Sequence, residues 1–478
     1  MEMIKVKLEG HDYRYEVFQI VSLFYNKSEI EFVEDDDFNV KSVVDYDNKS
    51  AKFKIYENNS LKICEDYKIT DDKKQIKNAI KLTALRALKN YTGINIPWGI
   101  LVGIRPTKIV HECYKSKLKD EDIINYLLSN YDLSLEKAIL ALEVAKNESK
   151  YLTYNKKDIS LYIDVPFCPS RCIYCSFTST PIKGNELIVN QYINALKKEI
   201  RCTLNFLKNK GFRIDTIYIG GGTPTSLSGD NLEIIFNELG SNIDLFKVKE
   251  FTVEAGRPDS IDCEKLKVLK EYGCSRISIN PQTMNDETLK RIGRLHDSKD
   301  IVDKYYIARN LGFDNINMDI IIGLIGENSN DVKNTMEKLK ELSPDSITIH
   351  TMAVKRASYL NERGYKAKSD EIDSMYDIAV NYVKNMGMYP YYMYRQKNMV
   401  SPLENVGYCM KDKECIYNIQ MIAENISIAG FGPGAITKLV FIDENRIERI
   451  SNVKDIKEYV TRIDEMIEKK LKGLDMLF

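Results

Sequence analysis

Three cysteines lie within eight residues in the stretch YIDVPFCPSRCIYCSF, which runs from 162 to 177. Cys168, Cys172 and Cys175 have the spacing C-x3-C-x2-C, and this stretch has no fourth cysteine. Thiols grouped in this way can bind a metal ion, form a disulfide or hold an iron–sulfur cluster. Because the chain has only ten cysteines in 478 residues, three of them in one loop point to a shared chemical role.

The number of ligands separates these alternatives. Structural zinc sites use four protein ligands, and no histidine or second cysteine pair stands nearby to complete the set. A disulfide would leave one thiol over. A cluster bound through three thiolates fits better, because the iron without a protein ligand can bind a substrate or cofactor. Pro166 and Pro169 keep the segment out of a helix, so the loop can wrap around a cuboidal cluster.

Strands and helices alternate regularly from the cysteine segment onward. Apolar runs typical of strands recur about every 30 residues, and helical segments such as 187–208 separate them. That segment places Val189, Leu196 and Leu204 on one apolar face. The alternation predicts an α/β fold, a partial (β/α)6 barrel with its site at the carboxyl ends of the strands. The expected strands are 160–165, 216–220, 251–255, 276–280, 315–322 and 346–351.

The segments that flank the barrel have other patterns. Residues 1–70 alternate apolar and polar in short runs, which predicts a small antiparallel β-rich N-terminal domain. Residues 71–155 form a helical segment, which with the first gives an α+β N-terminal domain. The barrel is expected at 156–380. Residues 381–478 mix short strands with a final helix, and we interpret them as an α+β cap.

Composition excludes some function classes. Lys and Arg (69) nearly balance Asp and Glu (70), which argues against a nucleic-acid binder that depends on phosphate contacts. No apolar leader and no run of about 18 apolar residues is present. We therefore expect a cytoplasmic protein without a membrane span. The other seven cysteines are scattered, as small buried apolar residues are.

Several motifs resemble a known superfamily. The cysteine spacing, with Tyr174 before the last cysteine, resembles the radical S-adenosylmethionine (SAM) signature, and GGGTPTSL at 220–227 resembles its glycine-rich element. VEAGRPD, RISINPQTMNDETLKRIGRLH and NMDIIIGLIGE are similar to blocks of the oxygen-independent coproporphyrinogen III oxidase family. PWGILVGIRPTK and PYYMYRQKN resemble its HemZ-type coproporphyrinogen dehydrogenase branch. The likeness covers about residues 90 to 440.

The resemblance implies the cofactors and the residues that bind them. In this family three thiolates hold a [4Fe-4S] cluster whose open iron binds SAM, and one electron cleaves SAM to a 5′-deoxyadenosyl radical. Members of this type bind a second SAM. The glycines and Thr223 are expected to bind through the backbone. The matching positions for SAM are Tyr162, Tyr174, Gly221, Gly222, Thr223, Glu254, Ala353 and Ile436, and those for the second SAM are Gln282, Arg294 and Asp319.

The implied reaction is the oxidative decarboxylation of two propionates of coproporphyrinogen III to vinyl groups, which gives protoporphyrinogen IX. Tyr162 and Asp164 are the catalytic candidates, and Asp164 stands where the family usually has a histidine. The substrate carries four propionates, so cationic partners are expected. The candidates are Lys355, Arg356, Arg395 and Lys397.

Partners and alternative functions follow from the same resemblance. A flavodoxin- or ferredoxin-type reductant would supply electrons, and we expect a monomer. A haem-binding chaperone of the HemW type has a similar set of motifs, and a radical SAM enzyme acting on another tetrapyrrole is a third alternative. Asp164 leaves these alternatives open, because none of the four histidines is an obvious substitute for the missing one.

Overall fold

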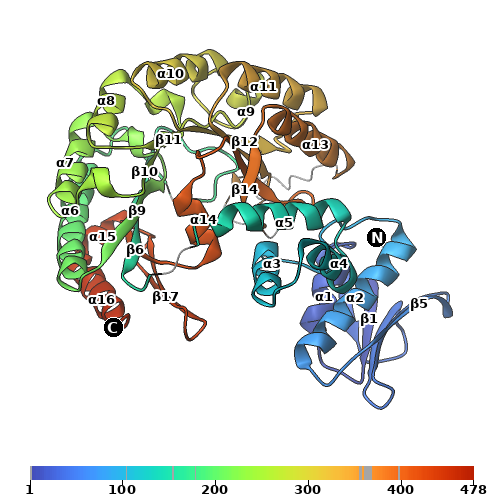
Figure 1. Ribbon diagram of the computed structural model, residues 1–478. Helices are drawn as coiled ribbons and strands as arrows, with labels where there is room; N and C mark the ends of the chain where they lie inside the picture. The colour runs from blue at the N-terminus through green and yellow to red at the C-terminus, as the bar shows by residue number, and fades with distance from the viewer. Residues whose placement is uncertain are drawn as a thin grey trace. The chain divides into compact units, whose positions relative to one another are not determined.

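The computed structural model describes residues 3–103, 105–152, 155–177, 179–354, 358–359, 369–396 and 399–478 (Figure 1). The chain divides into two compact units, Met1–Ala145 and Lys146–Phe478. Each unit has its own sheet and its own buried apolar side chains. In the part of the chain that is described, no helix is both long enough and apolar enough to cross a bilayer.

The N-terminal unit contains a five-stranded sheet in the order β2-β1-β3-β4-β5, and helix α2 packs on β4 and β5. β1 pairs in parallel with β2 and β3, while β3, β4 and β5 are antiparallel. The expectation of a purely antiparallel sheet is therefore wrong for β1, because α1 carries the chain back between β1 and β2. The elements are β1 (Ile4–Glu9), α1 (Arg14–Val21), β2 (Ile30–Val33), β3 (Val40–Asp45), β4 (Ser50–Glu57), β5 (Ser60–Lys68), α2 (Lys73–Thr92), α3 (Pro106–Lys115), α4 (Asp120–Tyr131) and α5 (Leu135–Ser149), whose end enters the second unit.

The second unit is built on six parallel strands that alternate with helices, as predicted (Figure 1). They form a partial (β/α)6 barrel, with the helices on its outside. The strands are β6 (Asp158–Val165), β9 (Arg213–Gly221), β10 (Glu250–Glu254), β11 (Arg276–Ser278), β12 (Ile316–Ile322) and β13 (Ser346–Thr351). The helices are α6 (Glu186–Asn209), α7 (Gly229–Gly240), α8 (Cys263–Glu271), α9 (Asp286–Arg291), α10 (Ser298–Asn310), α11 (Ser329–Leu342) and α13 (Ser369–Asn385).

The C-terminal segment mixes strands and helices, as predicted, and its strands extend the barrel sheet at both edges. β16 pairs in parallel with β6 and is followed outward by β17 and β18, while β15 and β14 extend the sheet beyond β13. The sheet thus has eleven strands. The elements are β14 (Tyr389–Tyr394), β15 (Asn405–Cys409), α14 (Ile416–Ala423), β16 (Ser427–Phe431), β17 (Ile436–Phe441), β18 (Arg446–Ser451), α15 (Ile456–Thr461) and α16 (Ile463–Asp475); β7 (Phe167–Cys168) and β8 (Thr180–Pro181) form a separate short pair.

Apolar periodicity explains why these segments form these elements. Leu161, Ile163 and Val165 of β6 are fully buried, as central strands of a covered sheet require. The apolar face predicted for α6 is also buried, since Val189 and Leu204 are at most 4% exposed. Side chains at this spacing lie on one side of a helix, so α6 packs against the sheet by that side.

One charged side chain of α6 is buried as well. Glu199 is fully buried and pairs with the equally buried Lys470 of α16 at 2.5 Å. Its carboxylate also accepts hydrogen bonds from the Tyr459 hydroxyl (2.6 Å), the Asn452 amide (2.8 Å) and the Gly432 backbone amide (2.9 Å). A buried carboxylate is tolerated only with such partners. Glu199 therefore fastens the last two helices and the β16–β17 turn to α6.

Replacing Lys470 should show how much the stability of the fold depends on its ion pair with Glu199. We expect Lys470→Met to lower the free energy of unfolding by about 3 kcal/mol, the lower end for a broken buried pair because Glu199 keeps its other donors. Chemical denaturation followed by circular dichroism measures the change. The matched control is Lys472→Met in the same helix, since Lys472 is three-quarters exposed. Equal stability of the two variants would contradict the prediction.

Candidate active site

One cavity of about 930 Å³ lies at the carboxyl ends of the barrel strands. Every predicted cluster, SAM and catalytic position lines it, although these residues come from segments across the whole second unit. Their roles as ligands stay predictions. The positions are Tyr162, Asp164, Cys168, Cys172, Tyr174, Cys175, Gly221, Gly222, Thr223, Glu254, Gln282, Arg294, Asp319, Ala353 and Ile436.

The three cysteines lie on the loop that follows β6. Cys168 Sγ is 3.5 Å from the Thr223 hydroxyl, and the Cys175 amide donates to the Cys172 carbonyl at 3.1 Å. Burial raises the pKa of the Cys168 and Cys175 thiols. Within the described residues, no His, Cys, Asp or Glu side chains gather as the ligands of a single ion would.

The glycine run brings the end of β9 against this loop. A Cβ at Gly222 would lie 2.5 Å from the Phe167 carbonyl oxygen, and one at Gly221 would lie 2.1 Å from Asp164 Oδ1. The amides of Gly222 and Thr223 donate to the carbonyls of Val165 (2.8 Å) and Phe167 (2.7 Å). These two amides are therefore used within the protein, and contacts of this segment's backbone with SAM stay a prediction. The glycine residues have no side chains, so the end of β9 can pack closely against the cysteine loop beside the cavity.

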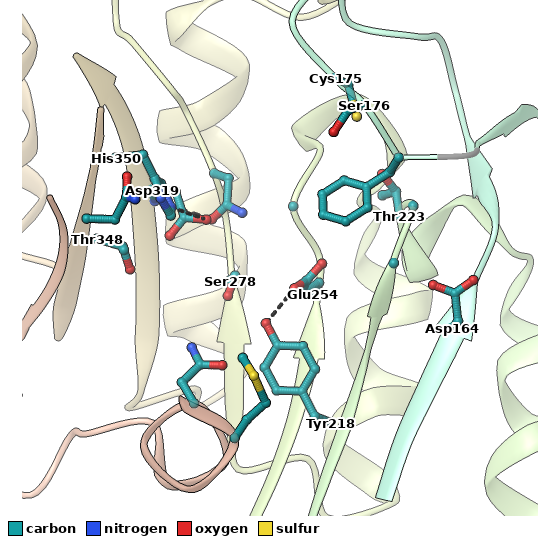
Figure 2. A pocket seen from close by; sticks show the side chains of 18 of the residues that line it. Asp164, Cys175, Ser176, Tyr218, Thr223, Glu254, Ser278, Asp319, Thr348 and His350 are labelled. Atoms are coloured by element: carbon teal, nitrogen blue, oxygen red, sulfur yellow. Dashed lines mark hydrogen bonds and ion pairs between the residues drawn. The ribbon is translucent and has the colours of Figure 1, made fainter. Parts of the chain in front are cut away.

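Two carboxyl groups line the cavity from β6 and β10, the strands on either side of β9 (Figure 2). Burial raises the pKa of Asp164 to about 7, and the Tyr162 hydroxyl donates to its Oδ1 at 3.2 Å. Burial likewise raises the pKa of Glu254 to about 7, against the effect of a short hydrogen bond from the Tyr218 hydroxyl. Both groups can therefore change protonation near neutral pH when a charged ligand enters.

The opposite wall carries a histidine that the sequence did not single out (Figure 2). His350 Nε2 lies 3.6 Å from Asp319 Oδ2, and its Nδ1 lies 3.2 Å from the Tyr394 hydroxyl. Burial would raise the pKa of Asp319, but His350 and the Asn317 amide hold it below its ordinary value. The strand alternation of SITIHT was the available signal, because it places His350 on the same face as Thr348, which also lines the cavity.

Aromatic side chains complete the cavity, and apart from Tyr162 those described next were also missed by the sequence analysis. Tyr218 stacks on Tyr417 with ring centroids 4.6 Å apart, and Tyr162 lies 6.3 and 6.2 Å from these two rings. Tyr392 and Tyr394 stack at 6.3 Å farther along the wall. All five rings line the cavity. Only the alternation of TIYIG and YYMY hinted at their direction.

The predicted cationic partners of the substrate are not assembled in the described part of the cavity. Arg395 does not line it and instead donates to the carbonyls of Leu403 (3.3 Å) and Pro402 (3.4 Å). Burial lowers the pKa of Arg395 to about 10. Lys355, Arg356 and Lys397 lie outside the described residues.

The raised pKa of Asp164 predicts how stability changes with pH. The carboxyl has a pKa of about 7 in the fold against an ordinary value of 3.8. The folded state therefore holds the proton more tightly, and stability is lost as pH rises between these values. Asp164→Asn removes this loss. The free energy of unfolding of the cluster-free variant, relative to that of the cluster-free wild type, should therefore rise by roughly 2 kcal/mol from pH 5 to pH 8.

Urea unfolding of the cluster-free proteins at the two pH values measures this gain. The exposed Asp303→Asn is the control and should follow the wild type at both. A difference between Asp164→Asn and wild type that does not change with pH would contradict the raised pKa.

Comparison with known proteins agrees with the geometry. The profile of the radical SAM superfamily matches residues 162–339. That superfamily implies a [4Fe-4S] cluster and SAM. The residues present fit both groups, because three thiols and the buried, unpartnered Oε1 of Gln282 and Nε of Arg294 border one cavity.

Similarity to named proteins identifies a smaller family within this superfamily. The oxygen-independent coproporphyrinogen-III oxidase-like protein HemZ of Bacillus subtilis is 37% identical over 99% of both chains. The heme chaperone HemW of the same organism is 34% identical over 48% of this chain and 62% of its own. Coproporphyrinogen III oxidase (HemN) of Escherichia coli has the same fold, with a TM-score of 0.54 at 21% identity over 70% of this chain and 74% of that one. The chain belongs to the radical SAM superfamily and, within it, to the family of oxygen-independent coproporphyrinogen-III oxidase-like proteins that contains HemZ.

Proposed function

We propose that the protein is an oxygen-independent coproporphyrinogen III dehydrogenase that converts two propionates of its substrate to vinyl groups and so makes protoporphyrinogen IX. The observation that carries the proposal is one cavity, near the upper end of the size range of ligand sites, bordered by the three cysteines and by a wall of tyrosines. The likeness to HemZ extends over 99% of both chains, whereas the HemW of the same organism matches less than half of this one.

Residues at different positions in the cavity have different proposed roles. Cys168, Cys172 and Cys175 hold the cluster, and Glu254 takes the amino or ribose groups of SAM. When bound, the cluster and SAM supply the abstraction of a hydrogen atom from the β-carbon of a propionate. That propionate then loses CO2 and passes one electron to an external one-electron acceptor, and its remaining two carbons become a vinyl group. The protein keeps the cavity shielded from water and orients the substrate.

The tyrosine wall suits a tetrapyrrole. Tyrosine rings present large apolar faces on which flat pyrrole rings pack, and their hydroxyls donate hydrogen bonds to carboxylates. Tyr162 and Asp164 border the same space, so they are the proposed catalytic residues. We further propose that a flavodoxin- or ferredoxin-type reductant supplies the electron and that the protein works as a monomer in the cytoplasm.

A second SAM is part of the proposal, and Gln282 supports it. Its backbone has a φ of +65°, which non-glycine residues rarely adopt, and its amide donates to the Asp319 carbonyl at 2.9 Å. Its side-chain Oε1 is buried without a hydrogen-bond partner, as is Nε of Arg294. Strained backbone and unsatisfied buried atoms in one cavity are typical of positions that a ligand completes.

The proposed reaction is tested anaerobically with reconstituted protein, SAM, a reductant and coproporphyrinogen III. We expect product masses that correspond to the loss of two carboxyl groups, formed in step with 5′-deoxyadenosine. Cys168→Ala protein, which lacks a cluster ligand, is the control and should form neither product. Tetrapyrrole left unchanged while SAM is cleaved would exclude this substrate, and stable haem binding with a defined Soret band would favour a chaperone.

The second SAM is tested by counting bound molecules. Equilibrium dialysis of the reconstituted protein with labelled SAM should give two molecules per chain, and Gln282→Ala should give one while its cluster absorbance is unchanged. Asn418→Ala, at a cavity position outside the proposed SAM contacts, is the control and should still bind two. One molecule bound by the wild type would refute the second site.

A further inference from the structure

A buried arginine that has no role so far contacts one of the three cysteines. Arg257 follows β10, begins the short 3-10 turn Pro258–Ser260 and is 3% exposed. Its Nη1 donates to Cys172 Sγ at 3.3 Å and to the Ser170 carbonyl at 3.3 Å. Its Nη2 donates to the Ser170 hydroxyl at 2.9 Å. The guanidinium thus binds the cysteine loop at both its backbone and a sulfur.

Asp259 and His296 hold this guanidinium in place. The Asp259 carboxylate accepts from Nε at 2.9 Å and from Nη2 at 2.7 Å, which is a bidentate pair. All five N–H groups of Arg257 are therefore used, and one of them is on the sulfur. The fully buried His296 side chain places its Nδ1 3.1 Å from Asp259 Oδ1. A chain of three side chains thus ends at Cys172.

A cation bonded to a cluster sulfur favours the reduced cluster. The potential of an iron–sulfur cluster depends on net charge, on hydrogen bonds to the sulfurs and on exposure to solvent. A [4Fe-4S] core held by three thiolates is negatively charged overall, and one added electron makes it more so. A buried positive charge beside it therefore stabilises the reduced form more than the oxidised form.

The other buried arginines that line the cavity, Arg276 and Arg294, have different partners. Arg276 donates to the Ser346 hydroxyl at 3.1 Å. Arg294 donates to the Tyr174 hydroxyl at 3.1 Å and to the carbonyls of Asn280 (2.8 Å) and Gly256 (3.3 Å). None of these bonds reaches a sulfur. Among the described buried arginines of the cavity, Arg257 is therefore the one that donates a hydrogen bond to a proposed cluster ligand.

We propose that Arg257 keeps its hydrogen bond to the Cys172 sulfur in the assembled cluster and raises the cluster's reduction potential, with Asp259 and His296 as its positioning residues. One electron then passes more readily from a donor of the flavodoxin or ferredoxin kind to the cluster. This role rests on the family assignment and on the cysteine ligands, and it holds whichever tetrapyrrole the protein accepts.

The test is a potentiometric titration of the anaerobically reconstituted full-length protein, followed by electron paramagnetic resonance. We expect Arg257→Gln to bind four irons per chain and to be reduced about tenfold less favourably, which is a midpoint about 59 mV more negative for one electron. Arg257→Lys keeps the charge but loses the fork, so its midpoint should fall between. Arg291→Gln, an exposed arginine that donates to the Ile325 carbonyl, is the control and should match the wild type.

An unchanged midpoint in Arg257→Gln protein with full iron content would overturn the proposal. If that variant binds no cluster, Arg257→Lys serves instead, because it keeps the charge and loses the fork that reaches the sulfur. A more negative midpoint in Arg257→Lys would support the proposal, and an unchanged one would overturn it. Because the measured quantity is a potential without substrate, the result is independent of whether coproporphyrinogen is converted.

Discussion

The site depends on the hydrogen bonds that continue the β6–β9 pairing beyond the ends of both strands. The amides of Gly222 and Thr223 reach back to the carbonyls of Val165 and Phe167, and Cys168 follows directly. A side chain at Gly222 would separate these segments, since its Cβ would lie 2.5 Å from the Phe167 carbonyl oxygen. The position of the cysteine loop is therefore set by backbone bonds, which are less adaptable than side-chain contacts.

The buried charges of the second unit follow one pattern. Glu199 and Arg257 are both almost fully buried, and both use their hydrogen-bonding groups on partners from distant segments. A charge without such partners would be expensive to bury. In each case the buried charge connects segments that are distant in the sequence. Glu199 joins the chain's last helices to α6, and Arg257 joins the turn after β10 to the cysteine loop.

Local patterns in the sequence were sufficient to predict the six barrel strands, the buried face of α6 and the cysteine, glycine and carboxylate positions that border the cavity. Each of these depends on periodicity or on a motif within a short stretch. The parallel pairing of β1 and the direction of Arg395 were not predictable, because they depend on segments far away in the chain, whereas the direction of His350 follows from the local alternation of its strand. Arg257 shows the same limit. The sequence GRPD displays Asp259 beside it, but Cys172 is 85 residues away.

The pairing of β6 with β16 also has a consequence for biosynthesis. β6 carries the cysteine loop, and one of its two neighbours is synthesised about 260 residues later, from Ser427 onward. At roughly 5 to 20 residues per second, a ribosome needs tens of seconds to cover that distance. Until then the strand beneath the cysteines has an open edge. Before that point β6 can pair only with β9, so the strand that leads into the cysteine loop gains its second neighbour only after nearly the whole chain has been made.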